Sequence, residues 1–355
     1  MQITKIPTED PIQDQWQLLD QFAYPANIRK YLQQHQIHES TTDLCEFIAG
    51  CISQAGAYFQ ASIAAPLFIS PLLLYYGATN LMIGAGSLLT GIIKPIGHHG
   101  ITLLPPEGAD PRIRGFQLRP CHPKNGALTW FCEIFSNGCP ITSHGMWSLE
   151  EILASVPDLK NDFERCYDDG MPFIIPVELQ EMEIDYKGDG ESRSLRIFET
   201  VALSDVSRFE NPVAHIKSVS DFASAYMNIG PPQKSEKFIR LNRRMRAEEI
   251  GFYNIYGKKF LELPHLKNQT PVTLNQLIIL FLGLFALGHI SRYSPHAWYP
   301  FVRADSTGER LIVQKFLSIA NRYIPNLVLN FILRSRIEFF HPGSESRLQG
   351  REIKL

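Results

Sequence analysis

Charged side chains are absent from one long stretch of this sequence, from Phe47 to Ile93. Such a stretch must be shielded from water, either by lipid or by the rest of the protein. A transmembrane helix needs roughly 20 consecutive apolar residues, whereas prolines and polar residues interrupt this stretch at Ser53, Gln54, Gln60, Pro66, Ser70, Pro71, Asn80 and Ser87. A second apolar block, Leu277 to Leu287, is too short for a span. We therefore expect buried helices and no insertion into a membrane.

Several familiar signatures are also absent. The six cysteines include no CxxC pair, and no basic segment followed by an apolar one opens the chain, which predicts reduced thiols in the cytoplasm. The sequence has no Walker loop, no GxGxxG and no GxSxG, which excludes the familiar phosphate loops and the hydrolase elbow. No HxxxH motif follows the adjacent His98 and His99 and no ExxH motif lies close to them, so we expect no metal site and no cofactor.

The composition is that of an ordinary globular protein. The chain has 355 residues, of which 45% are hydrophobic and 20% charged, with a formal net charge of -2. This length is enough for one large domain or two ordinary ones with a sizeable core. The charge balance does not indicate nucleic-acid binding, so any contact with a polyanion must depend on a local patch.

Apolar periodicity predicts helices at both ends of the chain. At the N-terminal end the expected helices cover residues 11–24, 26–36, 43–64 and 70–91, the last two separated at Pro66 to Pro71. At the C-terminal end they cover residues 273–290, 308–323 and 326–337. The uncharged central helices need apolar partners, and the C-terminal helices offer such a surface, so we expect the two ends to pack together.

The middle of the chain has a different pattern. Short alternating runs divided by Gly, Pro, Asp and Asn predict strands of a small antiparallel sheet at residues 116–119, 127–135, 173–182, 194–202, 237–241 and 259–263. A helix at 147–166 interrupts them, and Ser148 with Glu151 predicts a capping box at its start.

These patterns predict the fold class and the domain organisation. We expect an α+β protein with a mainly helical core built from the N- and C-terminal helices and a small antiparallel β-rich middle insertion. The expected regions are a helical one at residues 1–100, a β-rich one at 101–268 and a helical one at 269–355 that packs on the first.

Candidate site residues lie where the uncharged stretch ends and on its second helix. His98 and His99 precede Gly100, and an imidazole near neutral pH can act as an acid or a base. The alternative is that one histidine orders the turn while the other is exposed. Tyr76 and Asn80, four residues apart, lie on one helix face and either project polar groups towards this loop or form buried hydrogen bonds between helices.

Another candidate is the segment from Arg292 to Trp298. It contains a guanidinium, the imidazole of His296 and two aromatic rings, close to the helix end that Pro295 predicts. Arg and His beside stacking aromatic rings can hold a phosphate and a base. The alternative is that Arg292 pairs with a buried carboxylate and Trp298 fills the core.

The main concentration of positive charge is at residues 234–246. It includes Arg240, Arg243 and Arg244, and such a patch can contact nucleic-acid phosphates through charge alone. The alternative is a solvated surface that nearby glutamates partly neutralise.

Two blocks of residues carry a resemblance to a known family. The first consists of Ala57-Tyr58-Phe59-Gln60-Ala61-Ser62, Ala65-Pro66-Leu67, Pro71-Leu72-Leu73-Leu74-Tyr75-Tyr76-Gly77, Asn80-Leu81 and His99-Gly100. The second consists of Ser291-Arg292-Tyr293-Ser294-Pro295-His296-Ala297-Trp298 and Ile324-Pro325-Asn326-Leu327-Val328-Leu329-Asn330. Together they resemble the YaaC-like proteins of bacteria, and the resemblance brings no defined activity with it.

A more distant resemblance is to the HEPN proteins, helical modules that include RNases and nucleotide-binding partners. It depends on the paired tyrosines, the polar residue one turn later and the loop that ends in His99-Gly100. Catalytic HEPN members separate an Arg from a His by four to six residues, whereas Arg292 and His296 have three residues between them. Whether the chain is an enzyme therefore stays open.

The resemblances imply binding of a nucleotide or RNA. In a ribonuclease, a histidine such as His99 or His296 would act as the general base towards the ribose 2′-hydroxyl, and Arg292 would stabilise the developing charge. The alternative is a non-catalytic interaction or regulatory subunit, in stress response or phage defence, that binds a protein partner. A Gly- and Ala-rich face on the second central helix also suggests a homodimer.

Overall fold

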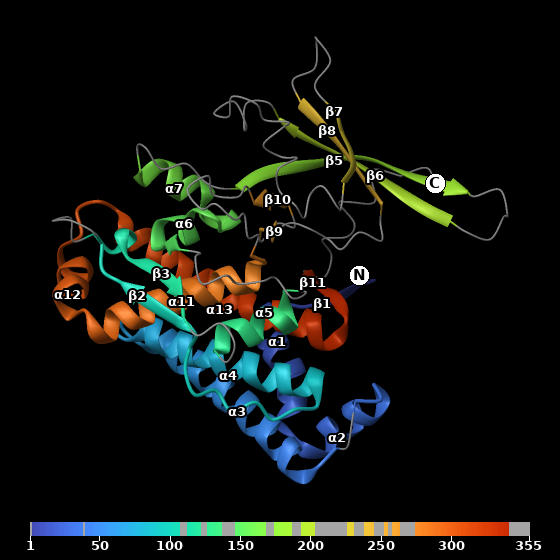
Figure 1. The fold of residues 1–355 in the computed structure, drawn as a ribbon, viewed down its shortest axis with the longest axis horizontal. Helices are drawn as coiled ribbons and strands as arrows, with labels where there is room; N and C mark the ends of the chain where they lie inside the picture. The colour runs from blue at the N-terminus through green and yellow to red at the C-terminus, as the bar shows by residue number, and fades with distance from the viewer. Residues whose placement is uncertain are drawn as a thin grey trace. The chain divides into compact units, whose positions relative to one another are not determined.

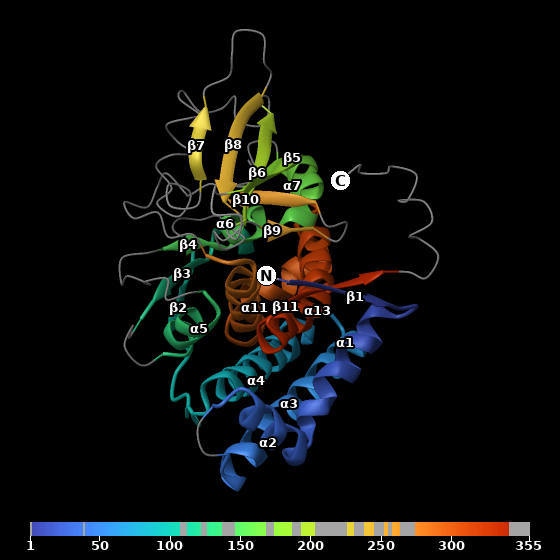
Figure 2. The ribbon, with the colours of Figure 1, turned by 90° about the vertical axis from the view of Figure 1, so that its right-hand side faces the viewer.

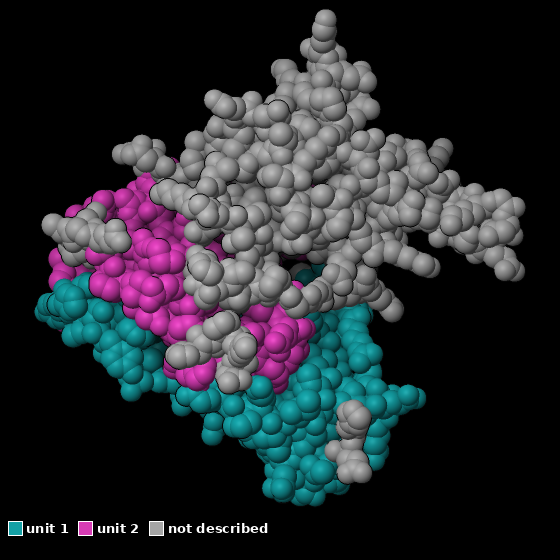
Figure 3. Space-filling view, in the orientation of Figure 1, with its two compact units in different colours: residues 1–97, 287–299, 317–355 teal, residues 98–286, 300–316 magenta. Residues whose placement is uncertain are grey.

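A computed structural model describes residues 2–37, 40–106, 112–121, 126–136, 146–167, 174–186, 193–202, 226–230, 238–244, 252–254, 258–262 and 274–340. The chain forms two compact units, drawn in different colours in Figure 3. Unit 1 comprises residues 1–97, 287–299 and 317–355, and unit 2 comprises residues 98–286 and 300–316. The coarse prediction of a mainly helical α+β fold is confirmed.

Unit 1 contains the long helices of the uncharged stretch. Its elements are β1 (Gln2–Pro7), α1 (Pro11–Asp20), α2 (Pro25–Gln34), α3 (Thr42–Ala64), α4 (Ser70–Thr90), the end of α11 (Gln276–Tyr293), the start of α12 (Pro295–Ala304), most of α13 (Glu309–Leu333) and β11 (Ser335–Phe340). Side-chain caps begin two of these helices, because Asp10 accepts hydrogen bonds from the first turn of α1 and Thr41 from that of α3. Gly91, with φ of 70°, ends α4.

The helices α3 and α4 lie side by side (Figures 1 and 2), and glycines allow their close approach. A Cβ atom at Gly77 would lie 2.7 Å from Cδ2 of Phe59, and one at Gly84 would lie 3.0 Å from Cβ of Cys51. The small-residue face of α4 is thus buried against α3 within unit 1. It is not available to a second copy of the chain, so a homodimer would need another surface.

The C-terminal helices differ from the prediction. The two segments expected at 308–323 and 326–337 are one helix, α13, which continues through Pro325 and ends at Leu333. Pro325 cannot donate a hydrogen bond to the preceding turn, but the buried Ile324, Val328 and Leu329 hold both sides of it in the core.

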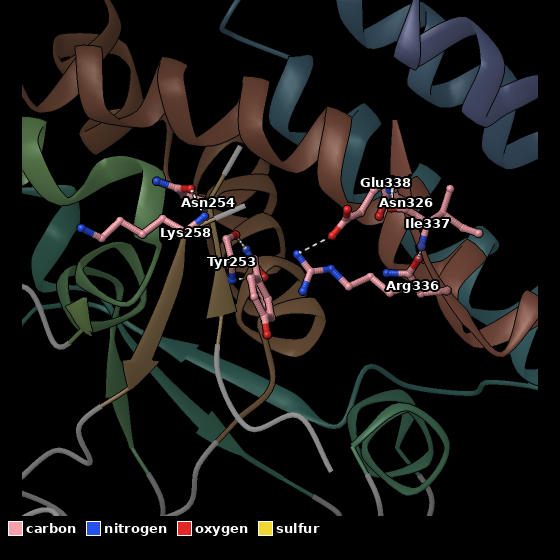
Figure 4. A network of polar contacts seen from close by, with 9 residues as sticks. Tyr253, Asn254, Lys258, Asn326, Arg336, Ile337 and Glu338 are labelled. Atoms are coloured by element: carbon pink, nitrogen blue, oxygen red, sulfur yellow. Dashed lines mark hydrogen bonds and ion pairs between the residues drawn. The ribbon is translucent and has the colours of Figure 1, made fainter. Parts of the chain in front are cut away.

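A parallel pair of strands from the two ends of the chain was not predicted. β1 pairs with β11, with Gln2 opposite Ser335 and Pro7 opposite Phe340. Two side chains of α13 bind the backbone of Ile337 on β11, since Asn330 accepts a hydrogen bond from the Ile337 amide at 2.8 Å and Asn326 donates one to the Ile337 carbonyl at 3.4 Å. Figure 4 shows Asn326 beside Ile337, together with the ion pair of Arg336 and Glu338.

Unit 2 contains two antiparallel sheets among its described residues. The first has the order β2 (Ile101–Leu104), β3 (Gln117–Pro120), β4 (Trp147–Ser148). The second has the order β7 (Tyr226–Gly230), β8 (Phe238–Arg244), β6 (Arg193–Ala202), β5 (Ile174–Tyr186), β10 (Lys259–Glu262), β9 (Phe252–Tyr253). Five of the six predicted strands correspond to β3, β5, β6, β8 and β10.

Two predictions in this unit need correction. Residues 127–135 form a helix, α5 (Ala127–Phe135), and the strand prediction is wrong. The buried Leu128, Phe131, Cys132 and Phe135 follow the helical spacing i, i+3, i+4, i+7, a pattern that the sequence already contained. The helix predicted at 147–166 begins with the expected capping box of Ser148 and Glu151, but divides at Pro157 into α6 (Leu149–Ala154) and α7 (Lys160–Cys166).

In the part of the chain that the structure describes, three helices are long and apolar enough to cross a membrane, judged by length and composition alone: α4, α11 and α13. In each, at least half of the most apolar window is buried inside the structure.

Candidate functional site

Arg292 lies at the exposed end of α11 and is held by aromatic side chains. Its Nη1 donates a hydrogen bond to the hydroxyl of Tyr76 on α4 at 2.7 Å. Its guanidinium carbon lies 4.8 Å from the ring centroid of the exposed Tyr293. The long arginine side chain thus has two contacts that limit its freedom while its charge stays at the surface.

Further tyrosines surround this contact. The Tyr76 ring lies 5.9 Å from that of Tyr58 on α3 and 5.5 Å from that of Tyr75, measured between centroids. Gly288 lets α11 approach α4 here, because a Cβ atom at this position would lie 3.2 Å from Cβ of Tyr75. We call Tyr58, Tyr75, Tyr76, Arg292 and Tyr293 the tyrosine–arginine cluster.

The electrostatics of this cluster follow from the uncharged stretch. Helix α4 has no charged residue and α3 has none after Glu46, so neither has a carboxylate near the tyrosines. Among the described residues no carboxylate forms an ion pair with Arg292, whose polar partner is a neutral phenol. Burial raises the pKa of Tyr75, so this neighbour also stays neutral. The guanidinium charge is therefore available to an external anion.

Two histidines flank the cluster along the chain. The ring of the half-buried His289 lies 4.7 Å from that of Tyr293. His296 lies in the first turn of α12 and is exposed. The sequence analysis predicted His296 as a site residue but not His289. The four-residue spacing of His289 and Tyr293 on one helix could have predicted the contact between their rings.

Trp298 and Asn80 have structural partners within unit 1. Trp298 is 2% exposed, and its Nε1 donates to the backbone carbonyl of Phe68 at 3.2 Å, which anchors α12 to the loop between α3 and α4. It therefore fills the core, one of the two alternatives for this residue. Asn80 is half-buried and donates to the Tyr76 carbonyl at 3.0 Å, one turn earlier in α4.

His98 and His99 belong to unit 2, where their backbone carbonyls cap the start of helix α5. The carbonyls of His98 and His99 accept hydrogen bonds from Ala127 and Leu128, both at 3.1 Å, and so satisfy the first amides of α5. Gly100 has φ of 74° and lies in close backbone contact with Gly126. The exposed His99 also places its ring 5.7 Å from that of Phe285.

The predicted basic patch falls on β8. Arg240 is opposite Thr200, Arg243 is opposite Ile197 and Arg244 is opposite Arg196 in the register with β6. The other residues of the predicted patch, 234–237, 245 and 246, lie outside the described residues.

Comparison with known proteins gives one positive result. A family model described as "YaaC-like Protein" matches residues 20–332, which include the tyrosine–arginine cluster. No curated protein and no solved structure matches this chain.

Proposed function

The chain belongs to the YaaC-like family, and we propose that it binds a nucleotide or single-stranded RNA through its tyrosine–arginine cluster. The observation that carries this proposal is the state of Arg292, an exposed guanidinium that contacts Tyr76 and Tyr293 and has no carboxylate partner among the described residues. An arginine is charged at every physiological pH, so this position attracts anions under all such conditions.

The chemistry of the cluster suits a phosphate joined to a base. A guanidinium can bind two oxygens of a phosphate with parallel hydrogen bonds. The ring of Tyr293, 58% exposed and in contact with the guanidinium, offers a face on which a base can stack. His296 follows on the next helix and would add a donor near the phosphate.

We further propose that the helices of unit 1 form a HEPN-related core. The paired tyrosines of that resemblance, Tyr75 and Tyr76, lie in the cluster, and Tyr76 bonds directly to Arg292. If the bound RNA is cleaved, the histidine of unit 1 suited to act as the general base is His296, with Arg292 stabilising the developing charge.

Equilibrium titrations with ADP and with a fluorescent RNA oligomer test binding. Arg292→Gln should weaken either ligand about tenfold or more, because a charge-assisted hydrogen bond is lost. Tyr76→Phe should weaken binding less, since it only frees the arginine side chain. Lys30→Gln is the matched control, because it removes an exposed charge from α2, elsewhere in unit 1, and should change affinity by less than about twofold.

Two results would count against the binding site. One is unchanged affinity in Arg292→Gln, and the other is an equal loss in Lys30→Gln. Electrophoresis of the same RNA samples follows cleavage separately, and there His296→Ala should abolish any product without weakening binding to the same degree.

A second candidate function is a non-catalytic subunit that binds a protein. The observation in its favour is a group of exposed apolar side chains in unit 1, namely Ile63, Ile69 and Tyr299, the last of which stacks on Phe68 at 6.1 Å. A regulatory role in stress response or phage defence would need such a surface. If neither ADP nor RNA binds while Ile69→Ser and Tyr299→Ser disrupt a stoichiometric protein complex, this second function is the correct one.

We propose a cytoplasmic location for either function. Two of the apolar helices, α4 and α11, support it, since most of the apolar window of each is buried within the protein. Fractionation of cells without detergent should leave the protein in the supernatant, and retention in washed membranes would contradict this proposal.

A further inference from the structure

A second exposed aromatic ring follows the tyrosine–arginine cluster along the chain. Tyr299 on α12 is 59% exposed, and its ring stacks on that of Phe68 in the loop before α4. The ring centroids are 6.1 Å apart and the ring planes form an angle of 30°. Phe68 covers one side of the Tyr299 ring, and the large exposed fraction leaves the other side open to a ligand.

The helix that carries this ring is held firmly in unit 1. A single residue, Ser294, joins α11 to α12, because its amide donates to the Ile290 carbonyl and its carbonyl accepts from the Trp298 amide, both at 2.9 Å. The buried Trp298 also donates from Nε1 to the Phe68 carbonyl at 3.2 Å. Both the backbone before Tyr299 and its ring therefore contact the same loop. A ring held in this way loses little conformational entropy when a ligand stacks on it.

Hydrogen-bond donors lie between the two exposed rings. Arg292 and Tyr293 end α11, and His296 lies in the first turn of α12. His296 and Tyr299 are three residues apart on one helix, so their side chains are neighbours. In chain order this exposed segment therefore presents a guanidinium with one ring, an imidazole, and a second ring.

The surrounding sequence suits a polyanion. All of these residues belong to two stretches, 47–106 and 263–304, that contain no Asp and no Glu. A chain of phosphates therefore meets no carboxylate from the segments that carry the rings. The order of ring, donor and ring also matches the repeat of base, phosphate and base in a single strand. A partner that offered apolar side chains alone would leave the Arg292 guanidinium unused.

We propose that the tyrosine–arginine cluster binds single-stranded RNA of two or more nucleotides in preference to a mononucleotide. One base stacks on Tyr293, the linking phosphate lies at Arg292 and His296, and the next base stacks on Tyr299. This assignment rests on the proposed function and names the substrate class of that site. Because each base stacked on an aromatic ring adds affinity, the second base should tighten binding about fivefold or more.

Titration of the full chain with two matched ligands tests this assignment. ADP and the dinucleotide pApA have two phosphate groups each and differ by one nucleoside. Wild type should bind pApA about fivefold or more tightly than ADP. Tyr299→Leu should remove this difference and leave the affinity for ADP within about twofold, which also shows that the variant is folded. Tyr299→Phe keeps the ring and should keep the difference.

Tyr24→Leu is the matched control, because Tyr24 is 63% exposed and lies before α2, elsewhere in unit 1. It should retain the wild-type preference for pApA. Equal affinities of wild type for the two ligands would overturn the assignment while leaving nucleotide binding intact. A preference that persists in Tyr299→Leu, or is lost equally in Tyr24→Leu, would also overturn it. If neither ligand binds, the proposed function itself fails, and this assignment fails with it.

Discussion

Arg292 and Glu309 show how neighbouring residues determine what a charged side chain can do. Arg292 ends a buried helix, and its nearest polar neighbour is the phenol of Tyr76 rather than a carboxylate, so its charge remains open to solvent and ligands. Glu309 is 2% exposed, and burial raises the pKa of its carboxyl although the Arg114 amide donates a hydrogen bond to it. The first residue is suited to binding and the second to responding to pH.

The buried carboxyl of Glu309 should make stability depend on pH. Its pKa is raised from 4.5 to about 7 on folding, so its contribution to the free energy of unfolding is complete below pH 4.5 and is lost as the pH rises through 7. A shift of this size corresponds to about 3 kcal/mol. Urea unfolding at pH 5 and pH 8 should show a larger decrease for wild type than for Glu309→Gln. Equal decreases in the two proteins would contradict the assignment.

At the scale of elements, the close packing of α3 and α4 depends on Gly77, which belongs to the Gly- and Ala-rich face of α4. Gly77→Ala should lower the free energy of unfolding by about 1–3 kcal/mol, since the new methyl group would overlap Phe59. Gly50→Ala on α3 is the matched control. It has no neighbour within 4 Å and should raise stability by about 1 kcal/mol through helix propensity alone. Thermal or urea unfolding gives both values, and equal stability of the two variants would contradict the packing described.

Helices were predictable from sequence where apolar spacing and end signals agreed. The helices α3 and α4 fall within a residue or so of their predicted ends, because Thr41 and Gly91 mark those ends chemically. Helix α5 was mistaken for a strand because its run of aromatic and apolar residues suits both elements, and the backbone of His98 and His99 that begins it comes from elsewhere in the chain. The pairing of β1 with β11 joins the two ends of the chain, which no local pattern can indicate.

The candidate site was also predictable only in part. Tyr76, Arg292 and Tyr293 all lie in segments that the sequence singled out, but the bond from Arg292 to Tyr76 spans 216 residues and depends on how α11 packs on α4. Trp298 was expected either to stack on a ligand or to fill the core, and its burial shows that it fills the core. The convergence of His99 with Arg292 stays a prediction, because the two residues belong to different units.

At the scale of the whole molecule, both ends of the chain contribute to unit 1, where β1 pairs with β11, while the two antiparallel sheets belong to unit 2. Helices α11, α12 and α13 each contribute residues to both units. The family model matches residues 20–332, which include parts of both units. The proposed ligand site is in unit 1 and the buried carboxyl of Glu309 is in unit 2, so each can be tested without the other.

The most direct test of the account is to purify the protein under native conditions and to identify what it carries, by absorbance ratio and by mass spectrometry of the extract. Wild type should carry a nucleotide or short RNA in stoichiometric amount, and Arg292→Gln purified in parallel should carry much less. Wild type that carries neither, but retains a protein in constant ratio, would contradict ligand binding at the tyrosine–arginine cluster and favour the interaction subunit.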